Sequence, residues 1–343
     1  MINRELTALT DRYIEELRGM GSELNPVASS LSEFILDGGK RFRPLFSYLG
    51  YLGAGASHRD EIVRASAALE LVHVCALIHD DVMDGSDTRR NKPAIHKTFE
   101  SLHRDNRYSG DSTKFGIASA ILIGDLALVW GDRILRDSGI TSDEFFAVMP
   151  IFTTMRDELM AGQYLDVLEG ALATTSVERS LNVARYKSGK YSIERPLHFG
   201  ATLAGGSAEL LDAYSSYGLP LGEAFQLRDD ILGVFGDPGV TGKPAGDDLR
   251  EGKRTVLLAM AMELADTKER EDLTVNIGRP DLTPSDITRL QSIIESSGAR
   301  ARCEALITSL TEEARLALRT PLIDATIATA LDQMAELATQ RSV

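Results

Sequence analysis

The residues best suited to chemistry are aspartates at the end of an apolar run, residues 79–84 (HDDVMD). On a helix, Asp80 and Asp84 would stand at i and i+4, so both carboxylates would project from one face. They would repel each other, and the negative end of the helix dipole would add to the repulsion. Magnesium would relieve both effects, because it takes one or two carboxylates and completes its shell with water and substrate phosphates. A merely solvated acidic helix end is the alternative for this motif alone.

A second aspartate pair, Asp229-Asp230, ends another apolar run at residues 223–228. It precedes residues 236–253 (GDPGVTGKPAGDDLREGK), whose glycines and prolines exclude a helix interior. The first motif similarly precedes a polar, charge-rich stretch at 83–112. Long loops in compact domains are usually functional or disordered. Two acidic helix ends that feed two long loops therefore indicate a site more strongly than one does.

Basic residues are clustered in a chain whose net charge is −14. Any one of them is more easily explained as a solvated surface charge. Together they indicate clamps for diphosphate, because the planar fork of arginine binds phosphate oxygens bidentately. The clustered cations are Lys40, Arg41, Arg43, Arg89, Arg90, Lys187, Lys190, Lys243, Lys253 and Arg254.

Helices must position these residues, because strand signals are nearly absent and helical periodicity runs through most of the chain. Residues 62–82, for example, place apolar side chains three or four apart. We therefore predict an all-α protein with ten or more helices and two long loops. The segments with helical patterns are roughly 3–18, 26–36, 62–82, 115–136, 143–169, 178–203, 207–235, 254–265 and 284–338.

Composition bounds the class of protein. Hydrophobic residues make up 43% and charged residues 26%, as in soluble globular enzymes. The acidic balance disfavours nucleic acid as a partner. Cys75 and Cys303 lie far apart, which argues against a disulfide framework or a zinc site and suits the cytoplasm. The N-terminus has no signal pattern, and residues 115–130 contain Asp125 and are too short for a convincing membrane span, so a buried helix is expected there.

The motifs follow one another along the chain in an order that is typical of one enzyme family. The chain resembles the trans-type polyprenyl synthetases, the farnesyl and geranylgeranyl diphosphate synthase family, over roughly residues 30–260. The resemblance implies a single domain over 1–343, folded as an isoprenoid synthase-type helical bundle around a central cavity with two long active-site loops. The matching motifs are residues 38–44 (GGKRFRP), 80–84 with Arg89-Arg90, Gly162-Gln163, Lys187-Ser188 and 225–230 (FQLRDD).

The resemblance also implies roles for individual residues. Asp80, Asp84 and Asp229 would be the metal ligands, holding about three magnesium ions. Contacts to the allylic diphosphate would come from Arg89, Lys187 and Lys243, with Lys253 near the closing loop. Isopentenyl diphosphate would be held by Lys40, Arg43, His73 and Arg90. Ser188 and Gln226 would act with Lys187 on the developing allylic cation.

His73 would more often be a satisfied core histidine if it stood alone, and the surrounding motif reverses that judgement. Two positions depart from the family pattern. Gly233 stands where many relatives have the third aspartate of the second motif, and Asp237 and Asp247 are possible outer-shell substitutes. Asn91 follows the arginine pair in the place of glycine. For residues 103–114 the sequence predicts no path.

The reaction implied is ionisation of an allylic diphosphate, followed by head-to-tail attack of isopentenyl diphosphate. Small residues one turn before the first motif, Cys75 and Ala76, would leave room for a long product. We therefore expect geranylgeranyl diphosphate, with farnesyl or longer products as the alternative and a homodimer as the family's usual assembly. A terpene cyclase, a non-catalytic subunit of a heteromeric synthase and a structural scaffold are the rival interpretations.

Overall fold

The computed structural model describes residues 1–237, 239 and 245–340. The all-α prediction is confirmed. Within the described ranges, the strands are β1 (Thr88–Arg89) and β2 (Lys92–Pro93), which pair antiparallel. The long helices are α1 (Ile2–Gly19), α2 (Asn25–Leu36), α3 (Phe42–Gly53), α4 (Asp60–Asp84), α5 (Ile95–Asp105), α6 (Ser112–Asp137), α7 (Ser142–Leu172), α8 (Val177–Ala184), α9 (Arg195–Leu203), α10 (Ala208–Phe235), α13 (Val256–Leu264), α14 (Thr267–Asn276), α15 (Pro284–Ser296), α16 (Ala299–Ala317) and α17 (Ala325–Thr339).

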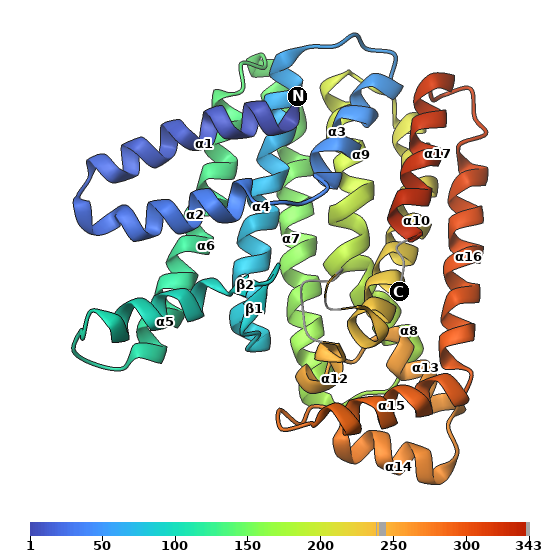
Figure 1. Cartoon of the computed structure of the whole chain (residues 1–343). Coiled ribbons are helices and arrows are strands. Elements are labelled where there is room, and N and C mark those ends of the chain that lie inside the picture. The colour runs from blue at the N-terminus through green and yellow to red at the C-terminus, as the bar shows by residue number, and fades with distance from the viewer. Residues whose placement is uncertain (238, 240–244, 341–343) are drawn as a thin grey trace. The chain divides into compact units, whose positions relative to one another are not determined.

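Among the described residues there are also a 3₁₀ turn at Ser22–Leu24, a π-helix at Arg185–Glu194 and α12 (Asp247–Glu251) (Figure 1). The chain groups into two compact units. The first comprises Met1–Pro150 and Pro196–Gly206, and the second comprises Ile151–Arg195 and Ser207–Val343. The single domain over 1–343 stays a prediction.

In the first unit, α4 packs closely against α6, and glycines set the spacing. A Cβ atom at Gly124 would lie 2.2 Å from Nε2 of His79, and one at Gly131 would lie 3.3 Å from the carbonyl oxygen of Ala68. A side chain at Gly124 would therefore displace the His79 ring, and one at Gly131 would fit only if the neighbouring backbone shifted slightly. Between α3 and α9 the approach is equally close, because a Cβ at Gly50 would lie 2.3 Å from the Leu197 carbonyl oxygen.

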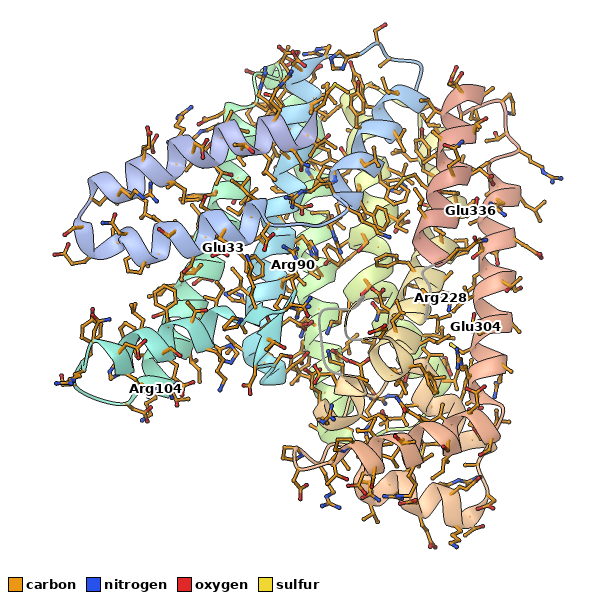
Figure 2. All side chains as sticks on the ribbon, viewed as in Figure 1. Glu33, Arg90, Arg104, Arg228, Glu304 and Glu336 are labelled. Atoms are coloured by element: carbon orange, nitrogen blue, oxygen red, sulfur yellow. The ribbon has the colours of Figure 1, made fainter. Side chains whose placement is uncertain are left out.

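In the second unit, α10 packs against α16 and against the π-helix. The Tyr217 hydroxyl donates to the Leu331 carbonyl at 2.7 Å. Arg228 binds Glu304 through Nη1 at 2.7 Å and Nη2 at 2.6 Å, so the α10 and α16 side chains meet in a two-point ion pair (Figure 2). These contacts fix α10, the helix that carries the second acidic motif.

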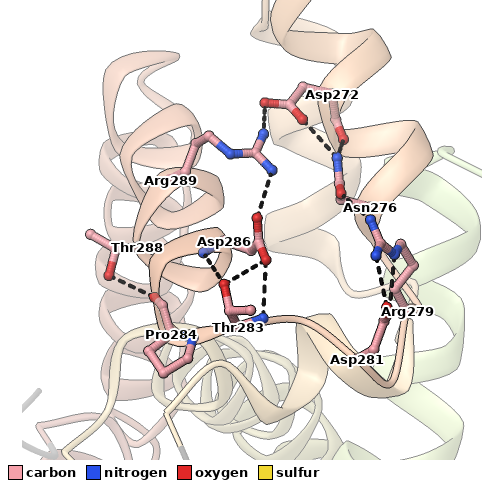
Figure 3. A network of polar contacts seen from close by, with 9 residues as sticks. All are labelled: Asp272, Asn276, Arg279, Asp281, Thr283, Pro284, Asp286, Thr288 and Arg289. Atoms are coloured by element: carbon pink, nitrogen blue, oxygen red, sulfur yellow. Dashed lines mark hydrogen bonds and ion pairs between the residues drawn. The ribbon is translucent and has the colours of Figure 1, made fainter.

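The α14–α15 connection is held by a capping box (Figure 3). The Thr283 hydroxyl accepts from the Asp286 N–H at 3.2 Å, and Asp286 accepts from the Thr283 N–H at 3.0 Å. Pro284 occupies the first turn of α15, where a missing N–H costs nothing. Arg289 then joins the Asp286 carboxylate to Asp272 on α14. The conformation of this end of the second unit is therefore fixed by contacts between residues that are close in sequence.

Several predicted boundaries were wrong. The patterns at 178–203 and 284–338 each divide into shorter helices, the latter with Gly298 in the left-handed region at φ 84°. Helices α3, α5, α12 and α14 were not predicted. Helix α5 lies inside the polar 83–112 stretch because Ile95 and Phe99 give it one buried face.

The expectation of a buried helix at 115–130 was also wrong in part. One face of α6 packs on α4 and α5, but Ile121, Leu122 and Val129 are exposed on the other face. Among the described residues, α4 and α6 are long and apolar enough to cross a membrane. In the best window of α4, however, 72% of the residues are buried, as in a core helix, against 39% in α6.

Candidate active site

The first acidic motif lies at the C-terminal end of α4. Gly85 adopts the left-handed conformation at φ 69° and ends the helix there. The β1–β2 hairpin then brings Arg89 back to the same end, where Nε lies 2.9 Å from Oδ1 of Asp81. A second nitrogen of Arg89 lies 3.5 Å from Oδ2 of Asp80. The hairpin thus places a cation directly beside the aspartates.

Asp81 is fully buried, and Arg89 is its partner. Burial opposes the charged form of Arg89, but the Asp81 carboxylate outweighs that cost and raises the pKa, with Asp80 and Asp84 contributing. The guanidinium therefore carries a permanent positive charge. Asp81 acts as its anchor, which leaves Asp80 and Asp84 as the carboxylates that stand at i and i+4 on one helix face.

Several arginines also lie in the first unit, which contains the acidic end of α4. Arg41, in the left-handed region at φ 52°, binds Glu70 at 2.5 Å and donates to the Ile35 carbonyl at 2.7 Å. Arg90 donates to the carbonyls of Phe34 and Asp37, and its guanidinium carbon lies 5.4 Å from the Phe34 ring centroid.

The backbone at Gly39 runs between these two arginines. A Cβ there would lie 3.4 Å from the Arg41 Nη1 and 3.7 Å from the Arg90 Nη2. Glycine, at φ 87°, is therefore what allows the chain to pass.

His73 lies among these cations. Burial lowers its pKa well below the ordinary value, and the charges of Arg43, Arg90, Arg89 and Arg41 lower it further. The imidazole is therefore neutral at neutral pH and can donate one hydrogen bond and accept another. Together, His73 and the four arginines form what we call the basic group: a positively charged neighbourhood in which the histidine itself adds no charge.

The remaining predicted cations of the first unit differ in exposure. Lys40 is exposed, and its ammonium lies 5.6 Å from the Phe42 ring centroid. Arg43 is buried in the first turn of α3. Lys40 and Arg43 are close in sequence, at the junction of a loop and α3. In the structure, however, Lys40 is a surface cation and Arg43 is a buried one.

The two predicted product-length residues differ in their surroundings. Ala76 shares a helical stripe with Asp80 and Asp84 and is partly exposed. Cys75 is fully buried, with Sγ 3.7 Å from Nδ1 of His79, and burial raises its pKa to about 12. Because α4 turns about 100° per residue, Cys75 belongs to the stripe that packs on α6.

His79 continues that packing stripe. Its Nε2 lies 3.0 Å from the Ile121 carbonyl and 3.7 Å from the Asp125 carboxylate, both on α6. The ring therefore fastens the acidic end of α4 to α6, in the space that Gly124 leaves open.

In the second unit, Lys187 and Ser188 lie on the π-helix. A π-helix is rare and often marks a functional site. It fits between α7 and α10 because glycines face it: a Cβ at Gly162 would lie 2.3 Å from the Lys187 nitrogen, and one at Gly222 would lie 2.4 Å from Cα of Gly189. The Lys187 ammonium binds Asp166 at 2.5 Å. Ser188 is buried.

The second acidic motif ends α10. Gln226 donates its amide N–H to Oδ1 of Asp230 at 2.7 Å. Burial raises the pKa of Asp230 to about 8, and the charges of Asp248 and Asp229 add to the rise, which the Gln226 bond opposes. Asp230 is therefore largely protonated at neutral pH, and the partly exposed Asp229 is the member of the pair with access to solvent.

Two lysines predicted to bind substrate follow this motif, and the structure describes one of them. Lys253 binds Glu251 at 2.9 Å and lies 3.9 Å from Asp248. Lys243 lies outside the described residues. Gly233 faces Asp248, because a Cβ at Gly233 would lie only 1.9 Å from Oδ2 of that residue.

The donor set fits magnesium better than a metal held by protein alone. Within the described ranges, no three His, Cys, Asp or Glu side chains converge as a complete cage. Magnesium does not require one, because it binds one or two carboxylates together with water and phosphate oxygens. Asp80 and Asp84 on the first unit, and Asp229 on the second, are the carboxylates suited to that role.

Sequence reasoning missed the residues that hold the predicted ones in place. Asp81 anchors Arg89, Glu70 anchors Arg41, and Asp166 binds Lys187. Each pair is distant in sequence or joins different elements, so periodicity gave no signal for the pairing. A charged residue predicted inside a core helix, such as Glu70, is the one feature that could have suggested a buried partner.

Comparison with known proteins provides independent evidence about the family of this chain. The sequence model of the polyprenyl synthetase family matches residues 25–294. The geranylfarnesyl diphosphate synthase of Aeropyrum pernix is 34% identical over 322 residues, which cover 92% of this chain and 94% of that protein. The geranylgeranyl diphosphate synthase of Mycobacterium tuberculosis is 32% identical, over 81% of this chain and 76% of that protein.

A solved structure is similar over almost the whole chain. The geranylgeranyl pyrophosphate synthase of Corynebacterium glutamicum, complexed with isoprenyl diphosphate and magnesium, superposes with a TM-score of 0.96 at 40% identity. The match covers 99% of this chain and 98% of the solved one.

Proposed function

Because the chain belongs to the polyprenyl synthetase family, we propose that it joins isopentenyl diphosphate head to tail to an allylic diphosphate. The main product is geranylgeranyl diphosphate, and diphosphate is released. Dimethylallyl, geranyl and farnesyl diphosphates are the allylic substrates. The cytoplasm is its expected location.

One observation supports this reaction most directly: an aspartate pair suited to magnesium and a basic group stand in the same unit. Asp80 and Asp84 stand at i and i+4 at the end of α4, and Arg89, the member of the basic group that pairs with Asp81, lies beside them. A synthase needs metal for the diphosphate that leaves and a separate basic group for the diphosphate that stays. A terpene cyclase needs only the first.

The residues divide the work as follows. Asp80 and Asp84 would hold magnesium for the allylic diphosphate, and Asp229 would hold a further ion. When bound, magnesium would stabilise the negative charge that develops on the departing diphosphate. Lys187 and Arg89 add fixed positive charge, oriented by Asp166 and Asp81.

Isopentenyl diphosphate is bound by Lys40, Arg43, His73 and Arg90. Neutral His73 can donate a hydrogen bond to a phosphate oxygen without adding charge. No side chain is assigned as the general base: the released diphosphate removes the proton. The buried Ser188 and the amide of Gln226 are assigned to the stabilisation of the allylic cation.

The length of the product depends on the α4 residues that precede Asp80 on the same face of the helix. The diphosphate end stays fixed, so the growing chain runs back along the α4 stripe that includes Ala76. Alanine there leaves room for added isoprene units. Relatives named for geranylgeranyl and geranylfarnesyl products support a long product.

A homodimer is the proposed assembly. The outer face of α6 exposes Phe115, Leu122 and Val129 at seven-residue intervals, the repeat of a helix-to-helix seam. Exposed apolar side chains in a continuous row mark interaction surfaces. A second copy of the chain, presenting the same row, fits this surface by symmetry.

The test of the proposed function is incorporation of radiolabelled isopentenyl diphosphate with each allylic primer and magnesium. Chromatography of the dephosphorylated products identifies the chain length. A cyclic product formed without isopentenyl diphosphate would favour the cyclase instead. A protein with no activity alone and activity only with a partner chain would favour the subunit.

A further inference from the structure

The space beside Gly233 is filled by a carboxylate from another element. An ideal Cβ at Gly233 would lie 1.9 Å from Oδ2, 2.4 Å from Cγ and 2.9 Å from Oδ1 of Asp248. Real Cβ atoms do not approach other atoms so closely. The Asp248 carboxylate therefore occupies the volume in which a side chain at position 233 would begin.

That volume is significant because of helical spacing. Asp229 and residue 233 are i and i+4 on α10, so a carboxylate rooted at 233 would face Asp229. Asp248 presents a carboxylate at the same place from α12. Its charge also acts on Asp230, the buried neighbour of Asp229. We propose that Asp248 supplies the third carboxylate of the second acidic motif and supports the metal ion held at Asp229.

The position of Asp248 is set by its own helix. The next residue, Leu249, is buried in the same core cluster as Ala224, Leu227 and Ile231 of α10. At the start of α12, Gly246 takes φ 70° and packs against Ile287. Because Leu249 points into the core, the preceding side chain is directed along α10 to Gly233.

The substitutes expected from sequence are less suitable. Asp237 is exposed, and its carboxylate accepts from the Gly239 N–H at 2.8 Å within its own turn. Asp247 lies one residue before Asp248, about 100° around the helix from it. The residue that meets Gly233 is Asp248, which the sequence analysis did not single out.

This inference rests on the proposed function, because it assumes a metal ion at Asp229. Carboxylates that orient metal ligands or metal-bound water are worth about 10–100-fold in metal affinity. Removing the Asp248 charge should therefore weaken one class of bound ion without unfolding the protein. Asparagine keeps the size of the side chain, and Lys253 keeps its bond to Glu251.

The experiment is a titration with Mn²⁺ and inorganic diphosphate, in which electron paramagnetic resonance measures free Mn²⁺. In Asp248→Asn, one class of ions should bind about 10–100-fold more weakly than in the wild type. The matched control, Asp247→Asn, should bind like the wild type. Asp229→Asn should weaken the same class as Asp248→Asn. Melting without metal checks that each variant is folded.

A reciprocal exchange makes the test specific. Gly233→Asp alone should weaken binding, because its Cβ collides with Asp248. The double variant Gly233→Asp/Asp248→Ala should regain affinity relative to Asp248→Ala, because the carboxylate returns from α10. A merely structural role for Asp248 would not be rescued in this way.

Two results would overturn the proposal: Asp248→Asn with wild-type Mn²⁺ binding, or a double variant that binds no more tightly than Asp248→Ala. Either result with a wild type that binds Mn²⁺ and incorporates isopentenyl label overturns this inference alone. A wild type that does neither overturns the proposed function as well.

Discussion

Arg89 and Asp81 form a two-contact ion pair at the end of α4, with Nε 2.9 Å from Oδ1 and 3.2 Å from Oδ2 of the carboxylate. Asp81 is thus the anchor of Arg89, and Asp80 lies farther from that guanidinium, at 3.5 Å. Three aspartates that look equivalent in sequence therefore differ in their contacts, and we propose metal binding for Asp80 and Asp84 alone.

Removal of the anchor should cost stability. Asp81→Ala leaves Arg89 with its charge largely buried, and breaking a buried pair in this way costs about 3–5 kcal/mol. Chemical denaturation would measure the loss in the free energy of unfolding. Asp80→Ala is the matched control: it removes a longer contact to Arg89, at 3.5 Å, and also relieves repulsion from the neighbouring carboxylates, so its loss of stability should be much smaller. Equal losses in the two variants would contradict the division of roles.

Removal of a metal ligand should act on the reaction and spare the fold. Asp84→Ala should lower kcat by about 10²–10³-fold, the range for losing one preorganised electrostatic contact. Thermal melting without metal should be unchanged or improved, because a repulsive charge is gone. Steady-state kinetics with and without chelator check both points. Full activity in excess chelator would contradict a metal-dependent reaction.

The two diphosphates should be separable by kinetics. Lys40→Ala should raise the KM for isopentenyl diphosphate more than the KM for the allylic substrate. Lys187→Ala should show the opposite bias, because we propose that its ammonium contacts the allylic diphosphate. Full kinetic matrices with both substrates varied provide the measurement. The same shift in both constants for both variants would show that the assignment is wrong.

Sequence alone predicted the helical class, because helical periodicity is a local property. Asp80 and Asp84 follow helical spacing, and their role as metal ligands, like that of Asp229, stays a prediction. The pairs Arg41–Glu70 and Lys187–Asp166 are not local, and no periodicity reports them. Gly233 appeared only as a missing carboxylate, because the approach of Asp248 depends on how Leu249 packs in the core.

Acid should destabilise the protein through His73. Its folded-state pKa lies well below the ordinary 6.5, with burial as the largest cause, so the unfolded chain binds a proton that the folded chain does not. That contribution to stability is present above pH 6.5 and is lost as the pH falls below it, by up to about 1.4 kcal/mol per pH unit. Denaturation between pH 7.5 and pH 5 should show a smaller loss in His73→Gln, and equal losses would contradict the shift.

The α6 seam should hold two copies together. Leu122→Glu places a charge in the exposed apolar row and should convert a dimer to a monomer in light scattering. Glu15→Gln, on an exposed position of α1, is a control that should leave the mass unchanged. A wild type that is monomeric at micromolar concentration would show that the seam serves another purpose.

Product length should depend on Ala76 more cleanly than on Cys75. Ala76→Phe adds an aromatic ring on the stripe of Asp80 and should shorten the main product. Cys75→Phe must fit beside His79 and should also lower stability, because overpacking a full core costs about 1–3 kcal/mol. Chromatography and melting would separate the two effects. Unchanged products from Ala76→Phe would place the limit elsewhere.

The most direct test is the purified protein with radiolabelled isopentenyl diphosphate, farnesyl diphosphate and Mg²⁺. The prediction is magnesium-dependent incorporation of label into geranylgeranyl diphosphate, with one diphosphate released for each bond formed. Absence of labelled prenyl product with every allylic primer, from folded protein in saturating Mg²⁺, would contradict the account.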